Sequence, residues 1–367
     1  VNENPGLENR SIVANLAYDL TPDDHIELRL GSYRSAVLGG PLGASRAQIL
    51  ASTGQGETAA ADLFAGGDVR EDYLGQPWQT AEIVDTERHE VTLRWLHALG
   101  VKGSLQLTGN YINHGQDSFY EGFDYVNDDD IFYGDARFTY FLGAGHLITV
   151  GADVRSEQLR SQSDALTAMQ AEDPSLTGDS YDYLAFGGYL QDVWTPLDSL
   201  EISLALRLDR ITADWIEQGK GNEIEEFLAS PRLHARLFHH PQWTSRISAG
   251  RGYRAPLTFF ESDHGILEDG FQTRVEALEK AWSAGYALSF DGQAISATAS
   301  AAWTRVSDLA FVDFDHPDRP TLMNSEDTVS VGTYDLTVGY EIIPGLTLGA
   351  AYEYFDLSED YQATFGV

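Results

Sequence analysis

The sequence contains no cysteine in its 367 residues. Disulfide bonds and thiolate metal sites are therefore excluded, a composition that suits an oxidising cell envelope without requiring one. Basic residues are also scarce, since 23 Lys and Arg stand against 57 Asp and Glu and the formal net charge is −34. A surface this acidic repels phosphate backbones, so nucleic acid is excluded as a partner.

Long apolar runs are absent as well. The sequence has no stretch of about 18 apolar residues, which excludes a transmembrane helix. The mean hydropathy of −0.27 still allows a membrane β-barrel, because barrel strands alternate lipid-facing apolar residues with lumen-facing polar ones. Residues 1–9 do not show the basic region and apolar stretch that mark a signal peptide.

Aromatic residues and glycine are plentiful, with 18 Tyr, 17 Phe, 7 Trp and 35 Gly. Membrane barrels need aromatic girdles and glycine-containing turns, although a soluble β-protein can show the same enrichment. Some aromatic residues lie beside predicted short turns, where a girdle belongs, and the ordinary preference of aromatic residues for strands explains them equally well. These residues are Tyr18, Trp95, Trp194, Trp243 and Tyr340.

Strict alternation of apolar and polar residues predicts β-strands. It is clearest over residues 148–155, 200–209, 334–342 and 346–354, where the polar positions include full charges. One face of each strand therefore meets water while the other is uniformly apolar. This pattern indicates an antiparallel sheet, in either a sandwich or a barrel.

The connections between the predicted strands distinguish these two architectures. Tight turns rich in Pro, Gly and Asp fall at residues 21–24, 99–100, 143–145, 195–198, 240–241, 291–292 and 344–345. Long polar stretches lie between them, at residues 34–85, 114–130, 156–180, 212–226, 257–273 and 306–327. Short turns that alternate with long loops are typical of outer-membrane barrels, whereas a propeller blade would need four short strands per repeat. Seven tight turns predict about fourteen strands.

One segment carries a resemblance to a known family. The strand predicted over residues 244–254 ends in Arg251-Gly252-Tyr253-Arg254-Ala255-Pro256. A strand with this ending, followed by a loop and a Glu-containing strand, resembles the barrel of TonB-dependent receptors. Glu279 and Ser283 occupy the nearest positions of that next element, without the family's preceding proline, and the run Tyr189–Asp192 resembles a further family segment.

The resemblance implies the fold and its extent. We expect an all-β, antiparallel transmembrane β-barrel with long extracellular loops and short periplasmic turns, forming a single domain over residues 1–367. Receptors of this type have barrels of about 22 strands, so about fourteen strands would be part of one. The family's plug domain and TonB box are not visible, and we interpret the chain as an internal barrel fragment.

The resemblance also implies a function. An outer-membrane receptor would take up a scarce ligand, by default a ferric siderophore or similar metal chelate. Energy would come from the TonB–ExbB–ExbD complex through the plug domain, and the barrel would contact outer-membrane lipid and lipopolysaccharide. The alternatives are a passive porin and a soluble β-rich adhesive or structural protein.

Within the motif, alternation places Arg251 and Arg254 on opposite faces, so that Arg254 points into the lumen or lies exposed at a strand end. Ligand contacts are expected from aromatic residues of the long loops. These residues are Phe119, Tyr120, Phe123 and Tyr125 in one cluster, and Phe259 and Phe260 beside Glu261 and His264 in another.

No catalytic motif is present. The sequence has neither a Gly-x-Ser-x-Gly nor a His-Glu-x-x-His element, and we expect no enzyme, no cofactor and no metal site. The run from Asn127 to Asp130 has oxygen ligands suited to calcium but lacks the glycine and distal glutamate of a defined loop. We interpret it as the solvated tip of an acidic loop.

Overall fold

In the computed structural model nearly all described residues lie in β-strands. The structure describes residues 6–39, 82–120, 123–163, 167, 171, 178, 180–216, 223–257, 272–313 and 321–359. Within these ranges no helix is long and apolar enough to cross a membrane.

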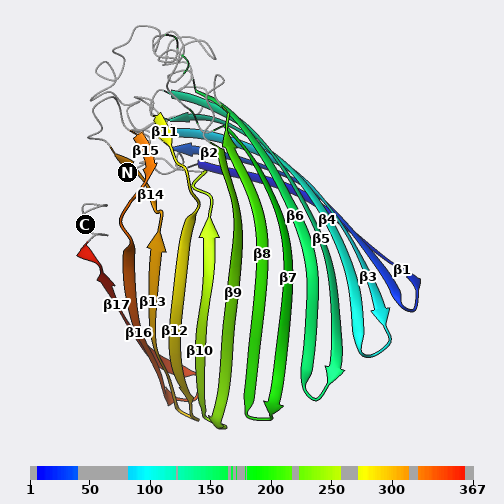
Figure 1. Cartoon of the computed structure of the whole chain (residues 1–367), viewed down its shortest axis with the longest axis vertical. Helices are drawn as coiled ribbons and strands as arrows, with labels where there is room; N and C mark the ends of the chain where they lie inside the picture. Colours follow the sequence, from blue (N-terminus) through cyan, green and yellow to red (C-terminus); the bar gives the residue numbers. More distant parts are fainter. Residues whose placement is uncertain are drawn as a thin grey trace.

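Fourteen strands form one antiparallel, strongly curved sheet in which neighbours in the sheet follow chain order (Figure 1). The first seven are β1 (Gly6–Thr21), β2 (Asp24–Gly39), β3 (Glu82–Leu99), β4 (Gly103–Tyr120), β5 (Phe123–Gly143), β6 (His146–Ser163) and β7 (Tyr181–Leu197). The others are β8 (Leu200–Trp215), β9 (Glu223–His240), β10 (Trp243–Arg254), β12 (Glu279–Asp291), β13 (Ile295–Ser307), β16 (Val329–Ile343) and β17 (Leu346–Leu357). The predicted number of about fourteen strands and their antiparallel pairing are confirmed for the large sheet.

Three short strands form a separate sheet at one end of the large one (Figure 1). They are β11 (Gln272–Arg274), β14 (Ala310–Asp313) and β15 (Thr321–Asn324). Strand β15 lies in the middle, parallel to β11 and antiparallel to β14. We call this end of the large sheet the mouth end, and the opposite end, where the tight hairpins lie, the turn end.

All seven predicted tight turns lie at the turn end and join consecutive strands of the large sheet. In three of these turns glycines have the positive φ that other residues adopt only with strain, for example 60° at Gly100 and 86° at Gly345. Gly145 has a second reason to be glycine, since an added Cβ would lie 2.4 Å from the carbonyl oxygen of Thr195.

The outer face of the large sheet carries an apolar band along the part of each strand that lies towards the turn end. On β8 the side chains of Leu204, Leu206 and Leu208 are 53%, 45% and 40% exposed, although they are fully apolar. Exposed apolar bands of this size need a lipid environment, because water would drive them to associate. We take the part of each strand with an apolar outer face, such as residues 200–208, as its membrane-spanning segment.

The five aromatic residues expected beside short turns all lie on this outer face near the turn end, by strand register. Trp243 packs against Phe290 of the neighbouring strand, with ring centroids 4.8 Å apart. Aromatic rings at one level of an apolar band are typical of a membrane–water interface. Their placement favours the interfacial girdle over strand propensity alone.

Towards the mouth end of β8 the polarity of both faces reverses. On β8 the outer positions become Arg210, Thr212 and Asp214, while the inner positions become Ile211, Ala213 and Trp215, which are buried. The reversal follows from the medium, since these residues lie beyond the apolar band and their outer face meets water. It was not predicted, because alternation was followed only through residue 209.

The buried inner residues at the mouth end form the main hydrophobic core of the described chain. The large sheet contributes Leu159, Tyr181, Ala185, Ile211, Ala213, Trp215, Ile224 and Leu228. The segment after β10 and the small sheet contribute Leu257, Val275, Leu278, Ala310 and Leu322. The small sheet is therefore packed onto the inner face of β6–β9.

The prediction of long polar loops was wrong in part. Residues 114–130 form the ends of β4 and β5, which pair from Gly103 to Tyr120 with only residues 121–122 outside the strands. The acidic run 127–130 is accordingly part of β5 and not a loop tip. Polar residues fill these strands because the outer face at the mouth end meets water.

The large sheet is open along both edges within the described residues. There, β1 pairs with β2 alone and β17 with β16 alone. A transmembrane barrel must pair every strand edge, because unpaired backbone groups are costly in lipid.

Candidate functional site

A pocket of about 530 Å³ lies on the inner face at the mouth end, where β5–β10 meet the segment that follows β10. The carboxylates of Asp153 and Glu157 contribute to its lining, and four arginines and four tyrosines make it rich in cationic donors and aromatic rings. They are Arg155, Arg207, Arg232 and Arg254 together with Tyr133, Tyr181, Tyr183 and Tyr253. We call this the arginine–tyrosine pocket.

Arg207 of β8 is the most firmly held of the four arginines. Its guanidinium donates to both carboxylate oxygens of Asp153, at 2.6 and 2.8 Å, and its Nε donates to Asp209 at 3.0 Å. The Asp209 side chain is fully buried, and that of Asp153 is 6% exposed. Charge-assisted bonds of this kind fix the guanidinium plane and prevent the side chain from sampling other rotamers.

Gly187 makes room for this arrangement. An added Cβ at Gly187 would lie 2.2 Å from a guanidinium nitrogen of Arg207. Gly187 is directly opposite Asp209 in the strand register, and the guanidinium of Arg207 occupies the space that a side chain at this position of β7 would fill. Glycine is therefore required at this position because a side chain would collide with the guanidinium, and not because the backbone has a positive φ.

Arg155 occupies the next position of the pocket wall. It pairs with Glu157 of the same strand and lies 5.7 Å above the ring of Tyr183. Glu157 also accepts a hydrogen bond from the hydroxyl of Tyr181. Burial and this bond raise the pKa of Tyr181 well above its usual range, so the hydroxyl stays protonated and donating.

The family-like motif contributes to the same pocket. Gly252, Tyr253, Arg254 and Ala255 line it, and Pro256 is buried behind it. Arg254 donates from Nη2 to Glu279 at 2.9 Å, while its own side chain remains 66% exposed. The lumenal orientation expected for Arg254 agrees with this position.

Glu279 explains why that arginine is held in place. The Glu279 carboxylate is buried and also accepts the backbone N–H of Ala310, the first residue of β14, at 3.0 Å. A buried carboxylate needs such partners, because burial alone would favour its neutral form. The motif arginine therefore links β10, β12 and the small sheet.

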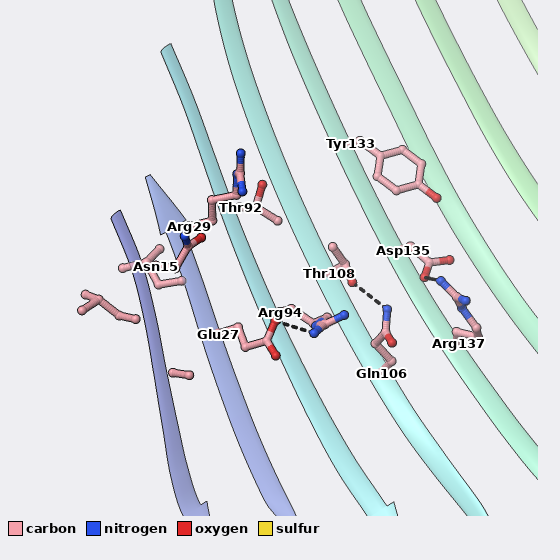
Figure 2. A pocket seen from close by; sticks show the side chains of 13 residues that line it. Asn15, Glu27, Arg29, Thr92, Arg94, Gln106, Thr108, Tyr133, Asp135 and Arg137 are labelled. Atoms are coloured by element: carbon pink, nitrogen blue, oxygen red, sulfur yellow. Dashed lines mark hydrogen bonds and ion pairs between the residues drawn. The ribbon is translucent and has the colours of Figure 1, made fainter. Parts of the chain in front are cut away.

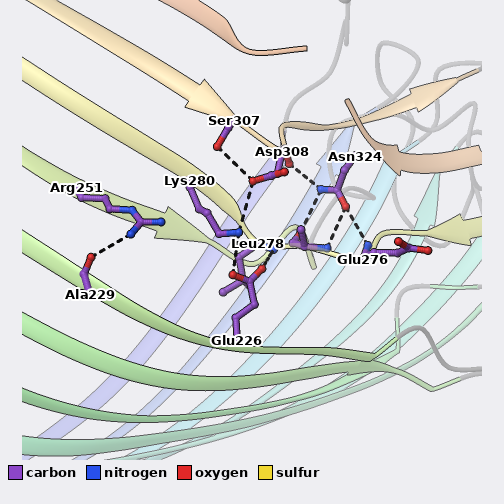
Figure 3. Close-up of polar contacts among 10 residues, drawn as sticks. Glu226, Ala229, Arg251, Glu276, Leu278, Lys280, Ser307, Asp308 and Asn324 are labelled. Atoms are coloured by element: carbon purple, nitrogen blue, oxygen red, sulfur yellow. Dashed lines mark hydrogen bonds and ion pairs between the residues drawn. The ribbon is translucent and has the colours of Figure 1, made fainter. Parts of the chain in front are cut away.

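A polar network ties the small sheet to the rim of the large one (Figure 3). Lys280 pairs with Glu226 at 2.8 Å, and Glu226 accepts the N–H of Leu278 at 2.9 Å. Asn324 accepts backbone N–H groups of Glu276 and Ala277 at 2.9 and 3.1 Å. These bonds give the mouth end of the pocket a fixed wall.

Arg251 lies apart from this network (Figure 3). It donates to the carbonyl oxygen of Ala229 at 3.4 Å and borders a neighbouring hollow. The carbonyl is available because the β9–β10 ladder ends at Arg232 and Gly250, next to Pro231, which has no N–H to donate.

A second hollow of about 590 Å³ lies on the inner face of β1–β5 (Figure 2). Its arginines are neutralised locally, since Arg94 pairs with Glu27 and Arg137 with Asp135. Because each of these arginines is paired with a carboxylate, the hollow has little net attraction for a charged ligand. Three arginines of the arginine–tyrosine pocket are paired in the same way, but Arg232 has no carboxylate partner among the described residues. This pocket therefore keeps one unpaired cation and is the stronger candidate for a binding site.

The ligand-contact residues expected from the sequence are placed only in part. Phe119 and Tyr120 lie at the end of β4 and Phe123 begins β5, but their side chains are outside the described residues, as are Phe259, Phe260, Glu261 and His264. Tyr125 lies on β5 and accepts a hydrogen bond from Asn127 at 3.2 Å.

Several pocket residues were missed from the sequence. Asp153, Arg155, Arg207 and Asp209 were assigned to polar strand faces without a role. A usable signal was present, since charges at alternate positions cluster at one end of two strands. The strand register that brings them together was not predictable from either segment alone.

An apolar outer face, a charged inner face and short turns at one end define an outer-membrane type of β-barrel sheet. The model of the family described as "TonB dependent receptor-like, beta-barrel" matches residues 10–366. The chain therefore belongs to the TonB-dependent receptor family and forms barrel structure, as the motif predicted. No curated protein matches it.

Three solved structures of similar fold are distant from this chain in sequence. The siderophore receptor PirA from Acinetobacter baumannii is 14% identical, with a TM-score of 0.66, covering 98% of this chain and 54% of that one. The alcaligin outer membrane receptor FauA from Bordetella pertussis is 14% identical, with a TM-score of 0.61 and coverage of 96% and 53%. The copper transporter OprC is 15% identical, with a TM-score of 0.66 and coverage of 97% and 53%. The chain thus spans about half the length of these proteins.

Proposed function

We propose that this protein is an outer-membrane receptor that takes up an anionic metal chelate, a ferric siderophore by default, with energy delivered by the TonB–ExbB–ExbD complex through a plug domain. The arginine–tyrosine pocket is the observation that carries the proposal. Its place at the mouth end makes it the part of the inner face that an external ligand meets first.

The chemistry of the pocket favours a negatively charged ligand with flat or aromatic groups. Guanidinium groups bind carboxylate and phenolate oxygens through paired donors, and tyrosine rings stack on planar ligand groups. The contrast with a net charge of −34 adds weight, since the unpaired guanidinium of Arg232 would draw an anion away from the acidic surface. Proteins of similar structure include a siderophore receptor, a ferric citrate transporter and a copper transporter.

The Arg232→Gln variant tests the ligand site most cleanly. Among the described residues Arg232 has no carboxylate partner, so its loss strands no buried acid. A lost charge-assisted bond to the ligand should weaken binding about tenfold. Equilibrium binding of iron-chelate candidates to the detergent-solubilised protein measures this effect, with Arg94→Gln in the second hollow as the matched control.

Energy-dependent uptake separates the receptor from a passive porin. A receptor accumulates radiolabelled chelate only in cells with an intact TonB system and a proton gradient, whereas a porin admits solute in their absence. Uptake that is unchanged by loss of TonB contradicts the proposed mechanism. Unchanged affinity in Arg232→Gln, with uptake intact, contradicts only the assignment of the ligand to this pocket.

A further inference from the structure

The arginines of the inner face fall into two groups. Seven of them pair with a carboxylate within the described residues. They are Arg29, Arg88, Arg94, Arg137, Arg155, Arg207 and Arg254. Three others, on the neighbouring strands β9 and β10, have no such pairing there: Arg232, Arg236 and Arg246. The three arginines without a carboxylate partner among the described residues thus lie on two neighbouring strands.

Arg236 and Arg246 face each other directly across the β9–β10 ladder. Like charges in opposite positions of an antiparallel pair repel and destabilise the sheet. Their own contacts do little to offset this repulsion. Arg246 donates to the Ser289 hydroxyl at a long 3.4 Å, and Arg236 lies over the ring of Phe238 at 4.6 Å.

Donor groups remain unused at this pair. The Nε atom of Arg236 is buried and has no hydrogen-bond partner among the described residues. Glu201 stands opposite Arg236 on its other side in the register, yet no ion pair forms between them there. A buried guanidinium nitrogen without an acceptor is costly, which indicates that an acceptor from outside the described chain completes the site.

We infer that Arg236 and Arg246 form an oxyanion-binding site on the inner wall near the turn end. Arg246 is three residues from the start of β10, about 10 Å along the strand. Arginines in directly opposite positions of adjacent strands can provide the paired donors that carboxylate and phosphate-like oxyanions accept.

The position of the site gives it a role in transport. Arg232 borders the arginine–tyrosine pocket and precedes Arg236 by four residues of β9, about 13 Å. An anionic ligand leaving the pocket would meet these charges next on its way to the turn end. This role rests on the proposed function, whereas the oxyanion site itself rests on the geometry of the two arginines.

Thermal unfolding in matched salts tests the oxyanion site. The protein, expressed from its own complete gene and purified in detergent, is heated in millimolar sodium sulfate or in chloride of equal ionic strength, and heat-modifiable gel mobility gives the midpoint. Sulfate that binds the folded state raises the midpoint. Millimolar concentrations keep its general salting-out effect small.

The double variant Arg236→Gln/Arg246→Gln should lose the sulfate response and be at least as stable as wild type in chloride, because the like-charge pair is gone. Glu201→Gln should respond at lower sulfate, since it removes a competing carboxylate. Arg94→Gln, which breaks a paired arginine, should keep the response.

Two results would overturn the inference. One is a sulfate response that persists in the double variant. The other is a double variant that is less stable than wild type in chloride, which would assign both arginines to an acidic protein segment. Uptake measurements do not enter either result, so failure of the receptor assignment would be seen separately.

Discussion

Removing the arginine at the centre of the pocket should destabilise the protein strongly. Arg207→Met keeps an unbranched side chain in place of the aliphatic part of arginine but leaves the carboxylates of Asp153 and Asp209 without their shared cation. Both carboxylates are almost fully buried, at 6% and 0% exposure, and four contacts of 2.6 to 3.0 Å join them to the guanidinium. Breaking a buried ion cluster by removing one partner costs about 3–5 kcal/mol, because the remaining charges cannot be solvated.

Two further variants locate the origin of this cost. The triple variant Arg207→Met/Asp153→Asn/Asp209→Asn removes the stranded charges and should recover at least half of the lost stability. Arg210→Met, on the outer face of the same strand, breaks an exposed pair with Glu225 and should cost less than about 1 kcal/mol.

Urea unfolding in phospholipid vesicles, followed by tryptophan fluorescence, gives the free energy of unfolding for each variant. The reasoning is refuted if Arg207→Met costs no more than Arg210→Met. It is also refuted if the triple variant is as unstable as the single one, since the loss would then come from packing and not from stranded charge.

Three other predictions follow from local features of the inner face. Burial and the charge of Glu157 raise the pKa of Asp129 to about 7, so the stability that this carboxyl contributes when protonated is lost as pH rises from about 4 through 7. Compared with wild type, Asp129→Asn should therefore gain about 1–2 kcal/mol in free energy of unfolding at pH 8 and nothing at pH 4, as measured by urea unfolding. An equal gain at both pH values would contradict this. Gly151→Ala should displace the Tyr189 ring, which lies 2.2 Å from the added Cβ, and cost about 1–3 kcal/mol; an unchanged unfolding midpoint argues against it. Asn324→Ala should speed hydrogen exchange of the amides that Asn324 caps, by about tenfold or more, without changing exchange in β3–β5; uniform acceleration would indicate global destabilisation instead.

The sequence by itself determined the strands and their order. Alternation over residues 200–209 and 334–342 marks strands whichever neighbours they meet, because side chains of a strand point to opposite faces at every step. Turn chemistry at residues such as Gly100 and Gly345 is equally local, since it depends on φ alone. Together with a six-residue motif, these features gave the barrel and the family correctly.

Only the tertiary structure decided which charges meet. Asp153 and Arg207 are 54 residues apart and belong to strands separated by β7, so their contact depends on the register of two intervening ladders. The contact between Arg254 and Glu279 likewise depends on how β10 and β12 pair beyond the intervening segment.

The same holds for the reversal of polarity at the mouth end. Ile211 and Trp215 look lipid-facing in a list of apolar residues, yet they are buried under the small sheet because they lie on the inner face beyond the apolar band. Alternation fixes which residues share a face, but it does not fix the medium that the face meets. That medium depends on the height of each residue along the strand, which the curvature and stagger of the whole sheet decide.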